Sequence, residues 1–353
     1  MDEESHNLKS TIMQERVPTT KSDMQKGISM PPFQKKIPNN ATLFSLIPPD
    51  DFQFKQPPFL EVINKRASHR RFTKASLTIE ELSFLLWCTQ GVKRVFKNGF
   101  MTFKTVPSAG ARHPFETYLV LNRVKGINRG LYRYVPHGHK LLFIKSLESE
   151  FENLAKILLN RAHIINAPVI FFWTVVPYRT VWKYKNPSYK LISIEIGMIC
   201  QNLYLASEAI GCGTCGTEIY IQDQTDDFLG VDGEDEFTVF LAPVGKPAAK
   251  LEISNFLSNP QNNVDLNKLK KLEGKYSGVI ELDIKIKDGS LFLSLSTGEI
   301  ALKIHNETEF ITEWNPAVWQ ILAVKFLLDD EGRPTSMEVL TINGLSFSFN
   351  SVE

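Results

Sequence analysis

The fold is decided by the stretch "LISIEIGMICQNLYLASEAIGCGTCG", Leu191 to Gly216, which joins a long helical pattern to a run of small residues. Apolar side chains recur at helical spacing, at Ile192, Ile196, Ile199, Leu203, Ala206 and Ile210. Gly211 follows the last apolar position and is predicted to end the helix. A long helix with one apolar face therefore leads into a turn that contains Cys212 and Cys215.

Strand candidates lie on both sides of this helix. "FETYLVLN", "GLYRYV" and "PVIFFWTVV" precede it, and "EFTVFLAPVG" follows it. The run Pro168 to Val176 is about half as long as a transmembrane helix needs, and its β-branched and aromatic residues indicate a buried strand. This mixture of strands and helices predicts an α+β or α/β domain.

A second helix is predicted within Leu77 to Gly91, "LTIEELSFLLWCTQG". Thr78 and Glu81 form a capping box, and Gly91 supplies the stop. Its apolar face is formed by Ile79, Leu82, Leu85, Leu86 and Thr89.

Composition indicates a globular chain. The 353 residues are 43% hydrophobic and 22% charged, which predicts a buried core and two domains. The net charge of +1 gives no overall bias toward nucleic acid or an anionic membrane. The first residues, "MDEESHNLKS", do not resemble a signal peptide, and four cysteines are too few for a disulfide framework. We therefore expect a cytoplasmic protein.

Changes in pattern divide the chain into four segments. Residues 1–58 are polar and proline-rich and are expected to form an extended arm, disordered at its start. Residues 59–250 form the mixed domain, and residues 251–271 form a linker. Residues 272–353 form an all-β domain, because "VIELDIKIK" alternates strictly before the turn signal Asp288-Gly289, and further turns are expected at Asp330 to Gly332 and Asn343-Gly344.

The first candidate site is "NKRASHRRF", which places Arg66, Ser68, Arg70 and Arg71 close together. Guanidinium groups bind phosphate bidentately and a serine hydroxyl adds a neutral hydrogen bond, so the cluster could hold a phosphate monoester. The alternative is a solvated basic surface, which is the commoner meaning of a short basic run.

Two further segments carry candidate chemistry. Pro107, Ser108, Ala109 and Gly110 are small residues before a strand, where backbone can approach a flat ligand closely. Their alternative is an ordinary tight loop. In "RTVWKYKNPSYK", the pair Lys183-Tyr184 could transfer protons. The alternative for this pair is surface packing.

Cys212 and Cys215 have the C-x-x-C spacing of a redox dithiol or half a zinc site. A zinc site needs about four ligands, and the remaining Cys88 and Cys200 lie within apolar helical patterns. A thioredoxin-like dithiol opens a helix, whereas this pair follows the end of one. We therefore favour a small-residue turn and expect no metal.

Taken together and in this order, the motifs indicate a protein family more specifically than any one of them does alone. Arg66 to Phe72 resembles the "R-x-S-x-R-x-F" opening of the nitroreductase superfamily, and Leu77 to Gly91, "PSAGARHPFETY" and "GLYRYVPHGHKL" follow in the family's order. "IEIGMICQNLYLASEAIGCG" resembles its "E-x-G-x-x-x-Q-N-L" helix. The resemblance covers about residues 59–247 and is to the SagB-type dehydrogenase branch, which includes azoline oxidases of thiazole and oxazole peptide biosynthesis.

That resemblance implies a nitroreductase-like mixed or antiparallel sheet flanked by helices, with FMN bound at the interface of a homodimer. It implies a phosphate site at Arg66, Ser68 and Arg70, with Lys246 a weaker candidate. It also implies a flavin-lining loop at Pro107 to Ala111, and close backbone approach at Gly213, Cys215, Gly216 and Thr217.

The implied activity is FMN-dependent oxidation of a heterocycle or modified peptide, of the azoline-to-azole type, with Lys183 and Tyr184 catalytic. The alternatives are a general NAD(P)H-dependent nitro or quinone reductase, and a catalytically weakened flavin-binding partner in a peptide-modifying complex. No nucleic-acid or membrane partner is expected. The C-terminal module loosely resembles β-rich domains appended to some serine hydrolases, with "L-x-G-x-Y-x-G" at Leu272 to Gly278.

The chain departs from the branch at three positions. The usual "K-Y-G-x-R" has Lys185 in place of the glycine and Pro187 in place of the arginine, and the histidine common in "E-x-G-H" is Met198. Lys185 and Pro187 directly follow the proposed catalytic pair, whereas the phosphate and loop motifs are intact. The sequence does not identify the substrate or the electron acceptor.

Overall fold

The computed structural model describes residues 20–352, except 56, 97–100, 149, 160, 249–256, 259–265, 279–280, 288–289, 296–297, 313–320 and 342–345. The chain divides into two compact units, Met1–Ala248 and Ala249–Glu353. The first carries every predicted site residue.

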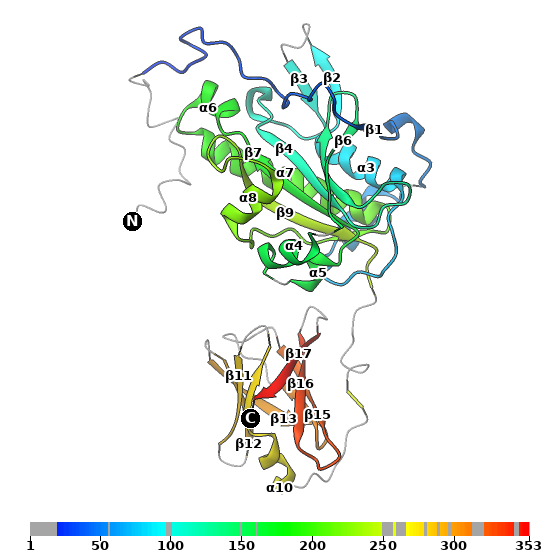
Figure 1. Ribbon diagram of the computed structural model, residues 1–353, viewed down its shortest axis with the longest axis vertical. Helices are drawn as coiled ribbons and strands as arrows, with labels where there is room; N and C mark the ends of the chain where they lie inside the picture. Colours follow the sequence, from blue (N-terminus) through cyan, green and yellow to red (C-terminus); the bar gives the residue numbers. More distant parts are fainter. Residues whose placement is uncertain are drawn as a thin grey trace. The chain divides into compact units, whose positions relative to one another are not determined.

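The first unit is built on a seven-stranded sheet of order β1-β6-β5-β4-β7-β9-β8, in which all neighbouring strands are antiparallel (Figure 1). A separate hairpin pairs β2 with β3. The elements of this unit are β1 (Leu43–Ser45), η2 (Pro49–Asp51), α2 (Phe59–Lys65), α3 (Ile79–Gln90), β2 (Val92–Phe96), β3 (Met101–Lys104), η3 (Ala109–Ala111), β4 (Phe115–Leu121), β5 (Gly130–Val135), β6 (Lys140–Ser146), α4 (Phe151–Ile157), α5 (Ala162–Ile165), β7 (Val169–Val175), α6 (Tyr178–Tyr184), α7 (Ser188–Ala209), β8 (Gly213–Thr214), α8 (Gln222–Leu229) and β9 (Phe237–Gly245).

Strand β7 is buried on both faces, as its apolar run predicts. Phe171 and Trp173 enter a core that also contains residues of α3 and α7, whereas Ile170 and Phe172 enter a second core with residues of α4, α5 and α8. Successive side chains of a strand point to opposite faces, so one continuous apolar run supplies both cores. The predicted α+β fold is confirmed.

The two principal helices begin and end close to the predicted residues. Thr78 accepts a hydrogen bond from the Glu81 backbone N–H, and the Glu81 carboxylate accepts one from Thr78 N–H, which completes the capping box of α3. Helix α7 ends just before Gly211, which has φ 64°. Its predicted apolar face packs into the same core as α3, through Ile192, Ile196, Ile199, Leu203, Ala206 and Ile210.

The described part of the N-terminal arm lies on the mixed domain. Residues Leu43–Ser45 form the edge strand β1, which pairs with β6, and Leu46 is buried in the core beyond it. Phe33 is also buried. The arm shows no hydrophobic periodicity in its sequence. Its backbone hydrogen-bonding partners in β1 belong to the domain that it covers. Residues 1–19, at the start of the arm where disorder is expected, lie outside the described residues.

The second unit is a closed antiparallel barrel, which confirms the predicted all-β domain. The predicted alternation is observed, with Leu282 and Ile284 inside the barrel core and Glu281 exposed. The turn at Asp330 to Gly332 is present, and the Gly332 N–H donates to Asp329 O at 3.0 Å. The turns expected at 288–289 and 343–344 lie outside the described residues. The strands are β10 (Gly274–Ser277), β11 (Glu281–Lys287), β12 (Ser290–Leu295), β13 (Gly298–Ile304), β14 (Glu309–Thr312), β15 (Ile321–Leu328), β16 (Pro334–Thr341) and β17 (Ser346–Val352).

The last residues of the expected linker are helical. Helix α10 (Leu266–Leu269) and η4 (Lys270–Leu272) lie at one end of the barrel (Figure 1). Leu269 and Leu272 are buried in the barrel core, which gives this polar segment a reason to be ordered. No helix in the described part of the chain is long and apolar enough to cross a membrane.

Candidate functional site

The basic motif and the cysteine turn, far apart in sequence, lie side by side. Ser68 and Thr214 form a parallel β-bridge, and His69 N–H donates to Thr214 O at 2.9 Å. The turn also pairs with the sheet, because Gly213 and Thr214 form β8 beside β9. The structure therefore brings together two of the segments in which sequence motifs predict flavin contacts.

Tyr204 of α7 joins these two segments, and the sequence analysis did not identify it. Its hydroxyl accepts a hydrogen bond from Gly216 N–H at 3.0 Å and lies 3.4 Å from the Ser68 hydroxyl oxygen. The Arg66 guanidinium carbon lies 5.6 Å from the centre of its ring. In the sequence, Tyr204 could have been noticed as an aromatic residue with a hydrogen-bonding hydroxyl in the helix that leads into the turn.

The basic residues suit a phosphate group. Arg66 and Ser68 are exposed, and within the described ranges no carboxylate lies at ion-pair distance from Arg66 or Arg70. The Arg66 guanidinium and the Ser68 hydroxyl both lie against Tyr204, and such groups are donors expected for a dianionic monoester. Participation of Arg70 stays a prediction. The residues present therefore fit the phosphate of FMN.

The glycines of the turn are required by packing inside the protein. A Cβ atom at Gly213 would lie 2.5 Å from the His69 ring, and one at Gly216 would lie 2.5 Å from the Phe240 ring. These contacts explain both glycines without a ligand. Close backbone approach to a flavin at Gly213 to Thr217 remains a prediction.

The cysteines of the turn are both buried. Burial raises the pKa of the Cys212 thiol to about 11, whereas a reactive dithiol needs a lowered pKa. All four cysteines are free, and no group of three or more His, Cys, Asp or Glu side chains among the described residues is placed to hold a metal ion.

Lys246, the weaker phosphate candidate, has partners within the protein. Its ammonium donates to the Glu81 carboxylate and, at 3.1 Å, to Ile210 O. It thus ties the first turn of α3 to the end of α7, which also places a cation at the negative end of that helix dipole. A phosphate role for Lys246 would have to compete with Glu81.

The loop Pro107 to Ala111 meets the Lys183-Tyr184 pair. Gly110 has φ 58°, and a Cβ atom there would lie 2.6 Å from the Tyr184 hydroxyl oxygen and 2.7 Å from Lys183 Nζ. Both side chains come from the last turn of α6. Two motifs separated by about 70 residues in sequence, each of them weak evidence alone, therefore form one cluster.

A buried polar network lies behind this loop, and the sequence analysis did not identify it. The Glu195 carboxylate of α7 accepts a hydrogen bond from Ser108, whose hydroxyl oxygen accepts one from His113 N–H at 2.8 Å. Burial raises the Glu195 pKa to about 7. Burial also lowers the pKa of Lys104, which donates to Gln90 at 2.8 Å, to about 8.

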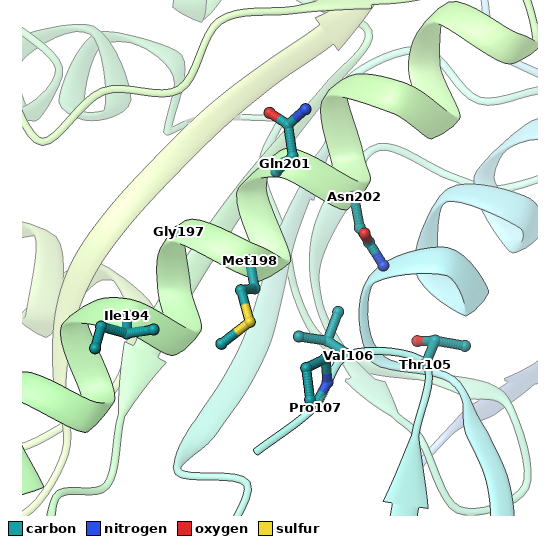
Figure 2. A pocket seen from close by; sticks show the side chains of 8 residues that line it. All are labelled: Thr105, Val106, Pro107, Ile194, Gly197, Met198, Gln201 and Asn202. Atoms are coloured by element: carbon teal, nitrogen blue, oxygen red, sulfur yellow. The ribbon is translucent and has the colours of Figure 1, made fainter. Parts of the chain in front are cut away.

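A pocket of about 350 Å³ opens between this loop and α7 (Figure 2). Met198, which stands where the resembling family commonly has histidine, extends from α7 toward Val106 and Pro107. Asn202 is held by donating to Cys88 O at 2.8 Å. The lining residues are Thr105, Val106, Pro107, Ile194, Gly197, Met198, Gln201 and Asn202.

Helix α7 contacts both halves of the candidate site. Glu195 meets the loop, and Tyr204, nine residues later, meets Ser68 and Gly216. Nine residues of α-helix span about 14 Å, so the pocket residues Gly197 to Asn202 lie between a phosphate-type cluster and the proton-transfer candidates. The arrangement suits an elongated ligand with an anionic end.

Residues of the first unit are similar in sequence to known proteins. The model of the Nitroreductase family matches residues 63–246. The "Putative nitroreductase MJ1384" of Methanocaldococcus jannaschii is 32% identical over 186 residues, which are 53% of this chain and 89% of that protein. The trifolitoxin-processing protein TfxB of Rhizobium leguminosarum bv. trifolii is 33% identical over 112 residues, or 31% of this chain and 30% of that protein.

Among solved structures, the Escherichia coli microcin synthetase McbBCD complex with truncated pro-MccB17 matches with a TM-score of 0.45 and 15% identity. The match covers 66% of this chain and 84% of that chain.

Replacing Gly110 tests the contact between the loop and the pair. We expect Gly110→Ala to be less stable than wild type by about 1–3 kcal/mol, because φ is positive and the new methyl group meets Tyr184 and Lys183. Gly126→Ala is the matched control, since Gly126 has φ 82° with no atom within 4 Å. Equal losses of unfolding free energy in urea for both variants would show that the contact contributes nothing.

The raised pKa of Glu195 predicts a pH-dependent stability difference. Because the folded pKa lies above the unfolded one, the protonated form stabilises the fold, and this contribution is lost as pH rises from about 4.5 through about 7. Glu195→Gln has no such loss and should gain up to about 3 kcal/mol over wild type between pH 5 and pH 8. Unfolding free energies at both pH values measure the difference, with exposed Glu234→Gln as control. A difference independent of pH would contradict the burial argument.

Proposed function

Because the chain belongs to the nitroreductase family, and is thus an oxidoreductase, we propose that it binds FMN and acts as a SagB-type dehydrogenase. Its substrate would be an azoline ring in a modified peptide, which is oxidised to an azole. The observation that carries the proposal is the contact of Lys183 and Tyr184 with Gly110, inside the loop expected to line the flavin.

Each part of the site has a role in this proposal. Arg66, Ser68 and Arg70 hold the phosphate, and the loop around Ser108 and Gly110 lines the ring. When bound, FMN supplies the two-electron redox chemistry. Lys183 or Tyr184 removes the proton from the azoline ring carbon, since both groups end at the loop. The base would be the neutral Lys183 amine or the Tyr184 phenolate, and the hydride that leaves with the second C–H bond would pass to the flavin. Lys183 Nζ lies 5.3 Å from the centre of the Tyr184 ring.

The name of one relative supports a peptide-type substrate. TfxB is a trifolitoxin-processing protein, and its matched segment is 33% identical to this chain. The match spans only 30% of that protein, so the processing role enters here as a proposal. The Methanocaldococcus jannaschii relative, covered over 89% of its length, favours the second candidate, a general NAD(P)H-dependent nitro or quinone reductase.

A homodimer is part of the proposal. Helix α2 exposes 71% of Phe59 and 69% of Leu60 beside α7, which itself exposes Ile194 next to the pocket. Neighbouring exposed apolar side chains are typical of interaction surfaces. A second subunit that covered Ile194 would also cover the pocket that this residue lines. A catalytically weakened flavin-binding partner is the third candidate, because Lys185 and Pro187 depart from the motif after Tyr184.

The phosphate assignment predicts weaker flavin binding in two variants. Purified full-length protein should be yellow and release FMN on denaturation. Arg66→Ala and Arg70→Ala should each raise the FMN dissociation constant about tenfold to a hundredfold, because each removes a charge-assisted hydrogen bond. Titration of flavin fluorescence measures this, and Lys74→Ala controls for general loss of charge. Colourless protein that cannot be reconstituted would end the FMN proposal.

The catalytic assignment predicts loss of turnover without loss of flavin. Lys183→Ala and Tyr184→Phe should lower kcat by about 10²–10⁴ on a synthetic peptide carrying one thiazoline ring, as expected for general acid–base groups. Mass spectrometry detects the product as a loss of two hydrogens. Turnover of p-nitrobenzoate with NADPH, together with no reaction of the thiazoline, would favour the second candidate. Unchanged kcat in both variants would remove the pair from the mechanism.

A further inference from the structure

The segment Thr20 to Ile28 of the N-terminal arm runs across the helix that carries the catalytic candidates. Met24 N–H donates to Trp182 O at 3.0 Å, and Trp182 Nε1–H donates to Ile28 O at 2.9 Å. The Tyr178 hydroxyl donates to Asp23 at 3.1 Å. The arm is thus bonded to both ends of α6, and Trp182 directly precedes Lys183.

Lys185 anchors the beginning of this segment. Its ammonium donates to Thr20 O at 2.9 Å and also to the Thr20 hydroxyl. Its backbone has φ 56° and ψ −133°, a conformation that residues other than glycine adopt only at a cost of about 1–3 kcal/mol. Lys185 stands where the motif it resembles has glycine, so the chain keeps a glycine conformation and adds a side chain that binds the arm.

The arm also reaches the loop on the other side of the pair. The Arg112 guanidinium lies between two rings, 5.0 Å from the centre of Phe33 in the arm and 5.2 Å from that of Trp182. Its Nε–H donates to Gly110 O at 3.1 Å. Arg112 therefore connects the arm and α6 to Gly110, the residue that Lys183 and Tyr184 contact.

The inner side of α6 shares a further partner with the arm. Arg179 donates to the Glu116 carboxylate at 2.5 Å, and the same oxygen accepts from Lys35 N–H at 2.9 Å. An isolated helix of seven residues is unstable in water, and α6 has no side-chain cap at its N-terminus. Its position therefore depends on these contacts.

We propose that residues Thr20 to Ile28 are a strap that positions Lys183 and Tyr184 against the flavin loop, with Lys185 and Trp182 as its positioning residues. The link to catalysis rests on the proposed function. The evidence that the segment is a strap comes only from contacts within the chain and does not require the proposed function. Lys185 thus keeps the backbone conformation of a glycine and adds the anchor to Thr20.

Hydrogen exchange tests the strap in the full-length protein, with and without added FMN. Lys185→Gly removes the two hydrogen bonds to Thr20, and Trp182→Phe removes the Nε1–H bond to Ile28 O. Amides in residues 20–28 and 178–184 should exchange about fivefold or more faster in both variants. Lys21→Ala, an exposed lysine of the same segment, should exchange like wild type. Lys185→Gly also relieves the strained backbone, so its melting temperature should stay close to that of wild type.

Turnover of the thiazoline peptide tests the positioning role. Lys185→Gly should lower kcat about tenfold with KM and FMN affinity unchanged, and Lys185→Arg, which keeps a donor for Thr20, should restore most of the rate. Exchange in residues 20–28 equal to wild type, or an unchanged kcat in Lys185→Gly, would overturn the proposal. Failure to bind FMN would end the proposed function alone, because faster exchange in the flavin-free variants would still support the strap.

Discussion

The packing of α7 against the antiparallel sheet is the constraint on which the site depends. Ile199 and Leu203 are fully buried in the core, so the rotation of the helix about its axis is determined. That rotation directs Glu195 to Ser108 and Tyr204 to Ser68 and Gly216. The pocket residues Gly197 to Asn202 lie between these two contacts along the helix. The hydrophobic effect thus determines where the polar groups of the site lie.

Around this helix, the site is built from segments that have little stability alone. The arm, the loop at Gly110 and the short helix α6 hold one another through hydrogen bonds and stacked rings, with Arg112 at their centre. Buried charges reinforce them, because the Arg179 and Glu116 pair and the carboxylate of Glu195 all lie out of water. Unpairing any of them would leave a buried polar group unsatisfied, which makes the arrangement specific.

Sequence reasoning succeeded where local physics decides the outcome. The capping box at Thr78 and Glu81, the apolar run of β7 and the stop of α7 at Gly211 are properties of short stretches, and each is observed. It was incomplete where partners are distant. The resemblance implies that backbone at Gly213 and Gly216 approaches a flavin, and the structure adds that the His69 and Phe240 rings also require glycine at these positions. Periodicity cannot reveal such contacts, because the atoms concerned come from other elements.

By itself, the sequence determined the fold class, the all-β second unit and the motifs that mark a nitroreductase-type chain, because these depend on hydrophobic period, turn chemistry and residue identity. Only the tertiary structure decided what the motifs meet. In the structure, Lys183 and Tyr184 lie against Gly110, and Lys246 forms an ion pair with Glu81. The N-terminal arm is hydrogen-bonded to α6. The physical reason is that side-chain contacts arise between segments far apart in the chain, and no local pattern encodes which segments become neighbours.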